Sequence, residues 1–201
     1  YIAQNPTVRI DFVPEKPKER EVIPPNVLHE ILQYLQTTNK HYLHLYPVED
    51  HCFDRRKEIT KLKEIHVMLK NGVIYVNKEV SKNKKSLPVT IPNVLLPYLA
   101  DHLKTAKAGD YLFSENYKPG SIRMAPKKIS DEWVKIRKAL NLPTIYQWYS
   151  LKDTGITNML KEGVPPIAVR DQARHHSIIQ TEAYTPKEIL KANQDIRYIT
   201  F

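Results

Sequence analysis

Apolar residues recur three or four positions apart along most of this chain, which is the spacing of one face of a helix. Near the start, Pro24-Pro25 and a capping Asn26 lead into the clearest stripe, formed by Val27, Leu28, Ile31, Leu32 and Leu35. Further helices are expected over residues 41–49, 93–107, 128–140, 151–160, 165–173 and 187–198. The pattern therefore predicts a largely helical protein.

A different pattern, with short apolar runs between turn residues, lies between the second and third of these helices. Ile65–Leu69 and Val73–Val76 flank Asn71-Gly72, the dipeptide that most strongly favours a tight hairpin. Leu87–Ile91 forms a third expected strand, and Pro88 favours an edge position because proline donates no ladder hydrogen bond. We therefore predict a mainly α fold with a small three-stranded antiparallel sheet.

Composition narrows the class of partner. The 201 residues carry a formal net charge of +9, with 41% hydrophobic and 26% charged residues, as in a globular domain with a sizeable core. The charge favours nucleic acid or an anionic membrane surface as partner, although a solubilising excess of lysine would give the same value. Cys52 is the only cysteine, which excludes an internal disulfide and favours a reducing cytoplasm. No run reaches transmembrane length, and no signal peptide is visible.

Residues 1–25 differ from the rest of the chain in composition. They contain five prolines, and Glu15–Glu21 is almost entirely charged. Such a segment favours an extended linker over a packed element. We expect an interdomain linker over residues 1–25 and one folded domain over residues 26–201.

Residues 149–184 carry the chemistry that the rest of the chain is expected to support. A Tyr-Ser-Leu-Lys run, Tyr149 to Lys152, opens a helix that ends near Gly163, where a left-handed residue suits a helix C-terminus. A second helix follows, and then Arg174-His175-His176-Ser177. Tyr184 lies nine residues after His175.

This order resembles the tyrosine recombinases, the phage-type integrase family. Their signature is His-x-x-Arg opening a helix, a Gly between helices, Gly-His-Ser, and a nucleophilic Tyr nine residues after that His. Gly163, His175 and Tyr184 are in register with it, whereas Tyr149 and Lys152 replace the His and the Arg. Arg174 stands where Gly is usual, and both departures are similar to a variant subgroup of mobile-element integrases.

Two further segments carry the same resemblance. The Arg-x-x-Glu pattern before the first strand identifies Arg55 as the first active-site arginine and Glu58 as its structural companion, with Arg56 as the alternative register. Lys82 resembles the lysine of the family's β-hairpin, with Lys84 and Lys85 as alternatives. From these residues alone, a solvated basic helix end and a charged hairpin tip that protects a sheet edge remain open.

The resemblance implies a DNA-joining site that needs neither metal, cofactor nor ATP. Tyr184 would attack the scissile phosphate, forming a 3′-phosphotyrosyl bond that stores the phosphodiester energy. Arg55 and His175 would bind that phosphate, and Lys82 would protonate the leaving 5′ oxygen. Lys152 would take the place of the second arginine, and Tyr149 that of the histidine. The expected DNA-binding residues are Arg56, Lys84, Lys85, Arg174 and His176.

The two replacements put full catalytic rate in question. Lys152 keeps a positive charge but loses the bidentate geometry of a guanidinium. Tyr149 keeps a hydroxyl donor but does not titrate near neutral pH. The alternative function is therefore a catalytically impaired DNA-binding relative of the integrases.

The resemblance also implies partners and surroundings. Double-stranded DNA would be the substrate, with four protomers on two duplexes during synapsis and a monomeric fragment in isolation. An N-terminal DNA-clamping domain would precede the linker and is absent from this sequence. The protein would act in the cytoplasm of a bacterium carrying a phage or mobile element, and Tyr184 could serve its own site or a neighbour's.

Other classes have weaker support from the residues. A type IB topoisomerase or a telomere resolvase would share the chemistry, but the short domain and the linker fit an integrase better. A metal site is the remaining alternative, although its spacing matches no standard zinc pattern. Its candidate ligands are His41, His44, His51 and Cys52.

Overall fold

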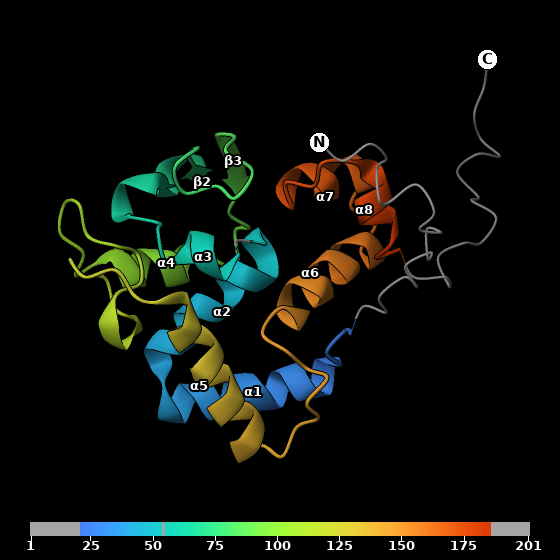
Figure 1. Cartoon of the computed structure of the whole chain (residues 1–201), viewed down its shortest axis with the longest axis horizontal. Coiled ribbons are helices and arrows are strands. Elements are labelled where there is room, and N and C mark those ends of the chain that lie inside the picture. Colours follow the sequence, from blue (N-terminus) through green and yellow to red (C-terminus); the bar gives the residue numbers. More distant parts are fainter. Residues whose placement is uncertain (1–20, 54, 186–201) are drawn as a thin grey trace, which may run out of the picture.

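The computed structural model describes residues 21–53 and 55–185, so the expected linker before residue 21 and the expected helix 187–198 lie outside the described residues. The α-helices are α1 (Pro25–Thr38), α2 (Lys40–Cys52), α3 (Arg56–Ile59), α4 (Leu96–Leu103), α5 (Pro126–Ala139), α6 (Ser150–Lys161), α7 (Pro166–Gln172) and α8 (Ile178–Glu182). Short 3₁₀ helices are η1 (Glu64–His66), η2 (Leu69–Asn71) and η3 (Glu115–Tyr117). The strands are β1 (Val67–Met68), β2 (Val73–Val76) and β3 (Leu87–Thr90). The predicted mainly α fold with a three-stranded antiparallel sheet is confirmed (Figure 1).

The sheet has the order β1-β2-β3, with both pairs antiparallel. β3 lies at an edge, which accommodates Pro88 opposite Tyr75. The first strand is shorter than predicted, because the residues on either side of it form the 3₁₀ helices η1 and η2. Gly72 adopts φ +62° and donates its N–H to Leu69 O at 3.1 Å, so a 3₁₀ turn replaces the expected two-residue hairpin loop.

Two helix predictions are corrected at their ends. Asn26 does not cap α1, because the helix begins one residue earlier and Pro24 occupies the N-cap position. α4 covers Leu96–Leu103 rather than residues 93–107, because a turn closed by Leu95 N–H donating to Pro92 O precedes it. Proline within the first turn costs α4 little, since that N–H would have no helical partner.

Helix α2 is the centre of the main core. The Tyr42 hydroxyl donates to Ile129 O on α5 at 2.9 Å, and its ring meets Trp148 edge-on at 5.5 Å. Helix α6 approaches α2 so closely that a Cβ at Gly155 would overlap the Asp50 carbonyl oxygen. The α2–α6 contact therefore requires glycine at this position, and it fixes the helix that carries Lys152 against the helix that precedes Arg55.

A second, smaller apolar cluster joins α6 to the last two helices. Its buried members are Phe53, Ile156, Leu160, Val169, Ala173 and Tyr184. As predicted, α6 ends just before Gly163, which adopts φ +82°, and Pro166 begins α7. The Gln172 side chain joins α7 to β3, because it accepts from Thr90 N–H at 2.9 Å and donates to Thr90 O at 2.8 Å.

These contacts determine where the expected site residues meet. In Figure 1 the sheet and the α7–α8 pair both lie toward the top of the view, while α1 and α5 lie toward the bottom. Across residues 21–53 and 55–185, every helix is too short or too polar to cross a bilayer.

Candidate active site

A basic cavity of about 460 Å³ opens beside α3, and it brings together residues from five separate segments of the chain. Three residues with expected catalytic roles line it, namely Arg55, Lys82 and Tyr149. Its cationic side chains are Arg55, Arg56, Lys57, Lys61, Lys82 and Arg123. Only two carboxylates, Glu49 and Glu58, also line the basic cavity. The excess of positive charge suits a polyanionic ligand such as a DNA backbone.

Glu58 organises the floor of the basic cavity with four hydrogen bonds. Its Oε1 accepts from the Lys82 backbone N–H at 2.8 Å and from Arg55 Nη1 at 3.4 Å. Its Oε2 accepts from the Arg55 backbone N–H at 3.0 Å and from Arg174 Nη2 at 2.7 Å. One carboxylate therefore connects the start of α3, the β2–β3 loop and the junction between α7 and α8.

The electrostatics of Glu58 favour its ionised form. Burial alone would raise the pKa of this carboxyl, since the side chain is fully buried. The Arg174 guanidinium and the N–H groups of Lys82 and Arg55 outweigh burial and hold the pKa of Glu58 below its ordinary value. The carboxylate is therefore charged at neutral pH and retains all four interactions.

Lys152 lies behind the basic cavity and is completely buried. Its ammonium donates to Phe53 O at 3.0 Å and to Ala173 O at 3.3 Å. These carbonyls belong to the C-cap residues of α2 and α7, where a cation also interacts favourably with the helix dipoles. Lys152 thus ties together the helix ends that precede Arg55 and His175.

Burial and neighbouring cations strongly affect the Lys152 ammonium. Desolvation is the largest cause, and repulsion from Arg55 and Arg174 adds to it, lowering the pKa of Lys152 to about 7. Glu49 and Glu58 act in the opposite direction by stabilising the charged form. In the structure, the Lys152 side chain lies against the carbonyls of Phe53 and Ala173 and does not line the basic cavity.

Tyr184 is buried within the smaller apolar cluster of its own chain. Its ring stacks on the His175 ring with centroids 5.8 Å apart and planes 17° apart. His175 Nδ1 lies 2.9 Å from Thr181 Oγ1, which fixes the imidazole on the first turns of α8. His175 and Tyr184 are therefore held as a pair by α8.

Tyr149 links this pair to the basic cavity. The residue is 39% exposed, lines the basic cavity and interacts with the Tyr184 side chain. Burial is the main cause that raises the pKa of Tyr149, and Asp153 raises it further, so the hydroxyl stays protonated at neutral pH. Tyr184, the nucleophile expected from sequence, therefore lies next to a residue of the cavity wall.

The residues expected to bind DNA fall into three settings. Arg56 lines the basic cavity and donates to Ser130 Oγ on α5, whereas Lys84 lines an adjacent cavity of about 480 Å³ that also contains Lys82. Lys85 and His176 are exposed. The Arg174 side chain is only 1% exposed and points at Glu58 instead of solvent.

Sequence spacing did not identify several side chains that line the basic cavity, among them Arg123, Lys61 and Glu49. Arg123 reaches it from the loop before α5, and its Nε donates to Thr60 O at 3.1 Å. Lys61 reaches the basic cavity from the segment that follows α3, and Glu49 reaches it from α2. Arg123 is more than 60 positions from Arg55, so no local motif could have related them.

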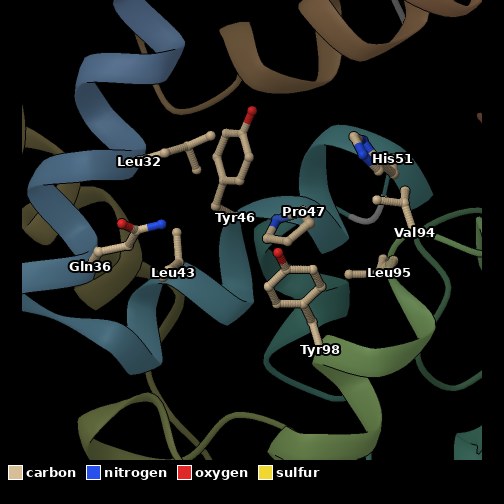
Figure 2. A pocket seen from close by; sticks show the side chains of 9 residues that line it. All are labelled: Leu32, Gln36, Leu43, Tyr46, Pro47, His51, Val94, Leu95 and Tyr98. Carbon is tan, nitrogen blue, oxygen red and sulfur yellow. The ribbon is translucent and has the colours of Figure 1, made fainter.

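The alternative metal ligands go to separate partners. His51 Nδ1 lies 2.6 Å from Asp50 Oδ2, His44 Nδ1 lies 3.0 Å from His102 Nδ1, and Cys52 is buried. Figure 2 shows His51 at one end of a mostly apolar cavity of about 250 Å³ that α1, α2 and the start of α4 enclose. Across the described parts of the chain, no group of three His, Cys, Asp or Glu side chains is arranged to hold a metal ion.

Comparisons with known proteins agree with this geometry. The sequence model of the phage integrase family matches residues 21–189. Among solved structures, the chain is similar to the XerA recombinase, with a TM-score of 0.69 and 18% identity over 92% of this chain and 64% of that one. It is also similar to the Tn1549 transposon integrase in complex with a circular intermediate DNA, with a TM-score of 0.72 and 16% identity over 91% and 65%.

A lambda integrase dimer bound to a core site is a third similar structure. Its TM-score is 0.66, with 13% identity over 89% of this chain and 64% of that one. The chain thus spans just under two thirds of the length of these proteins. No curated protein matches the sequence.

Proposed function

The chain belongs to the phage integrase family, and we propose that it breaks and rejoins DNA strands as a tyrosine recombinase. One observation carries the proposal, namely that Tyr184 interacts with Tyr149, which lines a cavity together with six cationic side chains. In this proposal residues 26–201 form the catalytic domain and residues 1–25 the linker to a DNA-clamping domain.

The proposed reaction uses the side chains on both sides of the basic cavity wall. Tyr184 Oη passes its proton to the neighbouring His175 and attacks the phosphorus, and the bond between phosphorus and the 5′ oxygen breaks, leaving a 3′-phosphotyrosyl link. Arg55 stabilises the charge that develops on the non-bridging oxygens, because a guanidinium stays charged and presents a fork of donors. Lys82 donates a proton to the 5′ oxygen, and His175 donates to the phosphate.

The buried state of Tyr184 requires a movement before this reaction. Tyr184 is 5% exposed and does not line the basic cavity, whereas Tyr149 does. DNA binding must therefore displace Tyr149 or shift α8 by enough to bring Oη to the phosphorus. A similar shift in a neighbouring protomer would allow delivery in trans.

DNA as the partner is supported by the charge of the basic cavity and by the relatives. The Tn1549 transposon integrase and the lambda integrase have similar folds and were solved with DNA. For this chain we propose double-stranded DNA as substrate and four protomers on two duplexes at synapsis.

A second function is favoured by the burial of Lys152. If its ammonium stays on Phe53 O and Ala173 O, only Arg55 among the two expected phosphate-binding cations reaches the basic cavity. The protein would then bind DNA sites without joining strands.

A nicked suicide duplex separates the two functions. The duplex carries the cognate element end and loses its cleaved fragment, so that any phosphotyrosyl adduct accumulates. The protein is used beside a Tyr184→Phe variant as the matched control. A denaturing gel with a Tyr184-dependent adduct supports the recombinase. Salt-sensitive DNA binding without any adduct supports the non-catalytic relative.

A further inference from the structure

The Glu58 carboxylate holds two guanidinium groups, one on each oxygen. Arg55 Nη1 approaches Oε1, and Arg174 Nη2 lies 2.7 Å from Oε2. The Arg55 side chain is 22% exposed and lines the basic cavity, whereas the side chains of Arg174 and Glu58 are 1% and 0% exposed. The Arg174–Glu58 ion pair is therefore closed to solvent, and it supports Arg55, whose side chain is partly exposed in the basic cavity.

The backbone at Arg174 is unusual for a residue with a side chain. It adopts φ +52°, in the left-handed region that favours glycine and that residues with a Cβ rarely adopt. Asn83 Nδ2 donates to Arg174 O at 3.2 Å, which joins the same residue to the loop that carries Lys82. A guanidinium is thus kept at a position where the backbone alone would prefer no Cβ.

Lys152 does not orient the Glu58 carboxylate, and the Arg174 guanidinium can perform this task instead. The ammonium has three donors, and two backbone carbonyls take its described hydrogen bonds. It does not hydrogen-bond to Glu58 within the described contacts, so the lysine does not orient that carboxylate. Arg174 does so from the neighbouring helix junction.

We propose that Arg174 is a positioning residue that compensates for the lysine at 152. By holding Glu58 Oε2, it fixes the carboxylate whose Oε1 orients the Arg55 side chain and the Lys82 backbone. This inference rests on the proposed function and deepens it, because Arg174 acts on the scissile phosphate only through Arg55 and Lys82. Arg174 itself does not contact DNA.

Compensation also implies that the two positions are coupled. Arg55 and Arg174 already repel the Lys152 ammonium, and the space around Lys152 and Arg174 is closed to solvent. An arginine at 152 beside Arg174 would add bulk and place a larger cation in this closed space. Lys152→Arg should therefore harm the protein that keeps Arg174, and should help the protein in which Arg174 has been replaced by glycine.

The test measures single-turnover adduct formation on the nicked suicide duplex at saturating protein, together with DNA affinity. The variants are Arg174→Gly, Arg174→Lys, Lys152→Arg and the double variant Lys152→Arg/Arg174→Gly. Arg170→Gln is the matched control, since Arg170 lies on the same segment and pairs with Asp171 at the surface. Thermal unfolding is measured for each variant.

We expect Arg174→Gly to form the adduct about 10²-fold more slowly, the size of effect that a misplacement of about 1 Å can cause, with DNA affinity unchanged. Arg174→Lys should recover part of the rate, and the double variant should be faster than either of its single parents. Arg170→Gln should match the original protein. The comparison of Lys152→Arg with the double variant keeps the test valid even if Arg174→Gly alone does not fold.

Two results would overturn the inference while leaving the proposed function intact. One is an Arg174→Gly variant that folds and forms the adduct at the original rate. The other is a loss of DNA affinity in Arg174→Gly with an unchanged rate at saturation, which would make Arg174 a DNA contact. Absence of an adduct in the unaltered protein would instead refute the proposed function, and the inference with it.

Discussion

The basic cavity differs from the group of buried side chains behind it, Lys152, Arg174 and Glu58, which we call the closed layer. The two regions use the same residue types in opposite ways. In the basic cavity, Arg55, Lys82 and Arg123 face solvent and outnumber the carboxylates. In the closed layer, Lys152 and Arg174 are buried and satisfied by backbone carbonyls and by Glu58. A positive charge in this fold therefore serves as a ligand-binding group only where it is open, and as a structural support where it is closed.

This difference bears on how the integrase signature is interpreted. The signature locates positions along the chain, but exposure decides what a cation at each position can touch. Lys152 stands at the position of the second arginine and yet contacts Phe53 O and Ala173 O. Arg174 stands at the position of a glycine and yet binds the carboxylate that orients Arg55.

The closed layer should give the largest effect on stability. Glu58→Gln would remove the charge that compensates a buried guanidinium, and breaking a buried pair typically costs about 3–5 kcal/mol. Glu162→Gln is the matched control, because Glu162 is exposed at the end of α6. Urea unfolding measures both variants. An equal, small decrease in the free energy of unfolding of both variants would show that the Glu58 charge does not stabilise the closed layer.

The pH dependence of stability provides the next effect. Between pH about 7 and 10.5, an unfolded Lys152 keeps a proton that the folded one has lost. The unfolded state therefore binds more protons, and stability rises with pH by up to about 1.4 kcal/mol per pH unit. Lys152→Met should remove this rise, while Lys161→Met, an exposed position on the same helix, should keep it. Identical pH profiles for the two variants would contradict the burial of the charge.

Glu58 gives the opposite dependence at low pH. Because its pKa is lowered in the folded state, its contribution is complete above the unfolded pKa of about 4.3 and is lost as pH falls through the folded value. Glu58→Gln should flatten this acid limb of the stability curve, whereas Glu162→Gln should leave it unchanged. Chemical unfolding between pH 2 and 6 measures the effect, and an acid limb that persists in Glu58→Gln would assign it to other carboxyls.

A substitution on the exposed β2–β3 loop should have the smallest effect on stability. It should change DNA binding instead. Lys84→Ala changes an exposed side chain of the β2–β3 loop, so the free energy of unfolding should change by less than about 0.5 kcal/mol. If Lys84 binds a phosphate, the slope of log affinity against log salt should fall by about 0.9. Lys107→Ala, at an exposed position remote from that loop, is the control. An unchanged slope in Lys84→Ala would remove this lysine from the DNA interface.

Local sequence signals predicted the elements whose causes are local. Gly163 and the proline at 166 end one helix and begin the next because each satisfies a backbone requirement at its own position. The periodic apolar stripe before Thr38 likewise sufficed for α1. The prediction that Asn26 caps α1 was wrong, because the helix begins at Pro25 and Pro24 occupies the N-cap position.

The closed layer could not be predicted from spacing. Whether Lys152 faces a phosphate or a carbonyl depends on how α2, α6 and α7 pack, and the close α2–α6 contact at Gly155 sets that packing. Arg123 joins the basic cavity through a contact with Thr60 O, which is distant in sequence. Arg55 and Lys82 nevertheless line the same cavity, whereas His175 and Tyr184 do not line it.

The proposed chemistry depends on one bond, between Tyr184 and a DNA phosphate. Mass spectrometry of the protein after reaction with the nicked suicide duplex identifies the modified residue. A nucleotide adduct on Tyr184, absent from the Tyr184→Phe variant, is the predicted result. DNA binding with an unmodified Tyr184, or an adduct that survives in Tyr184→Phe, would contradict it.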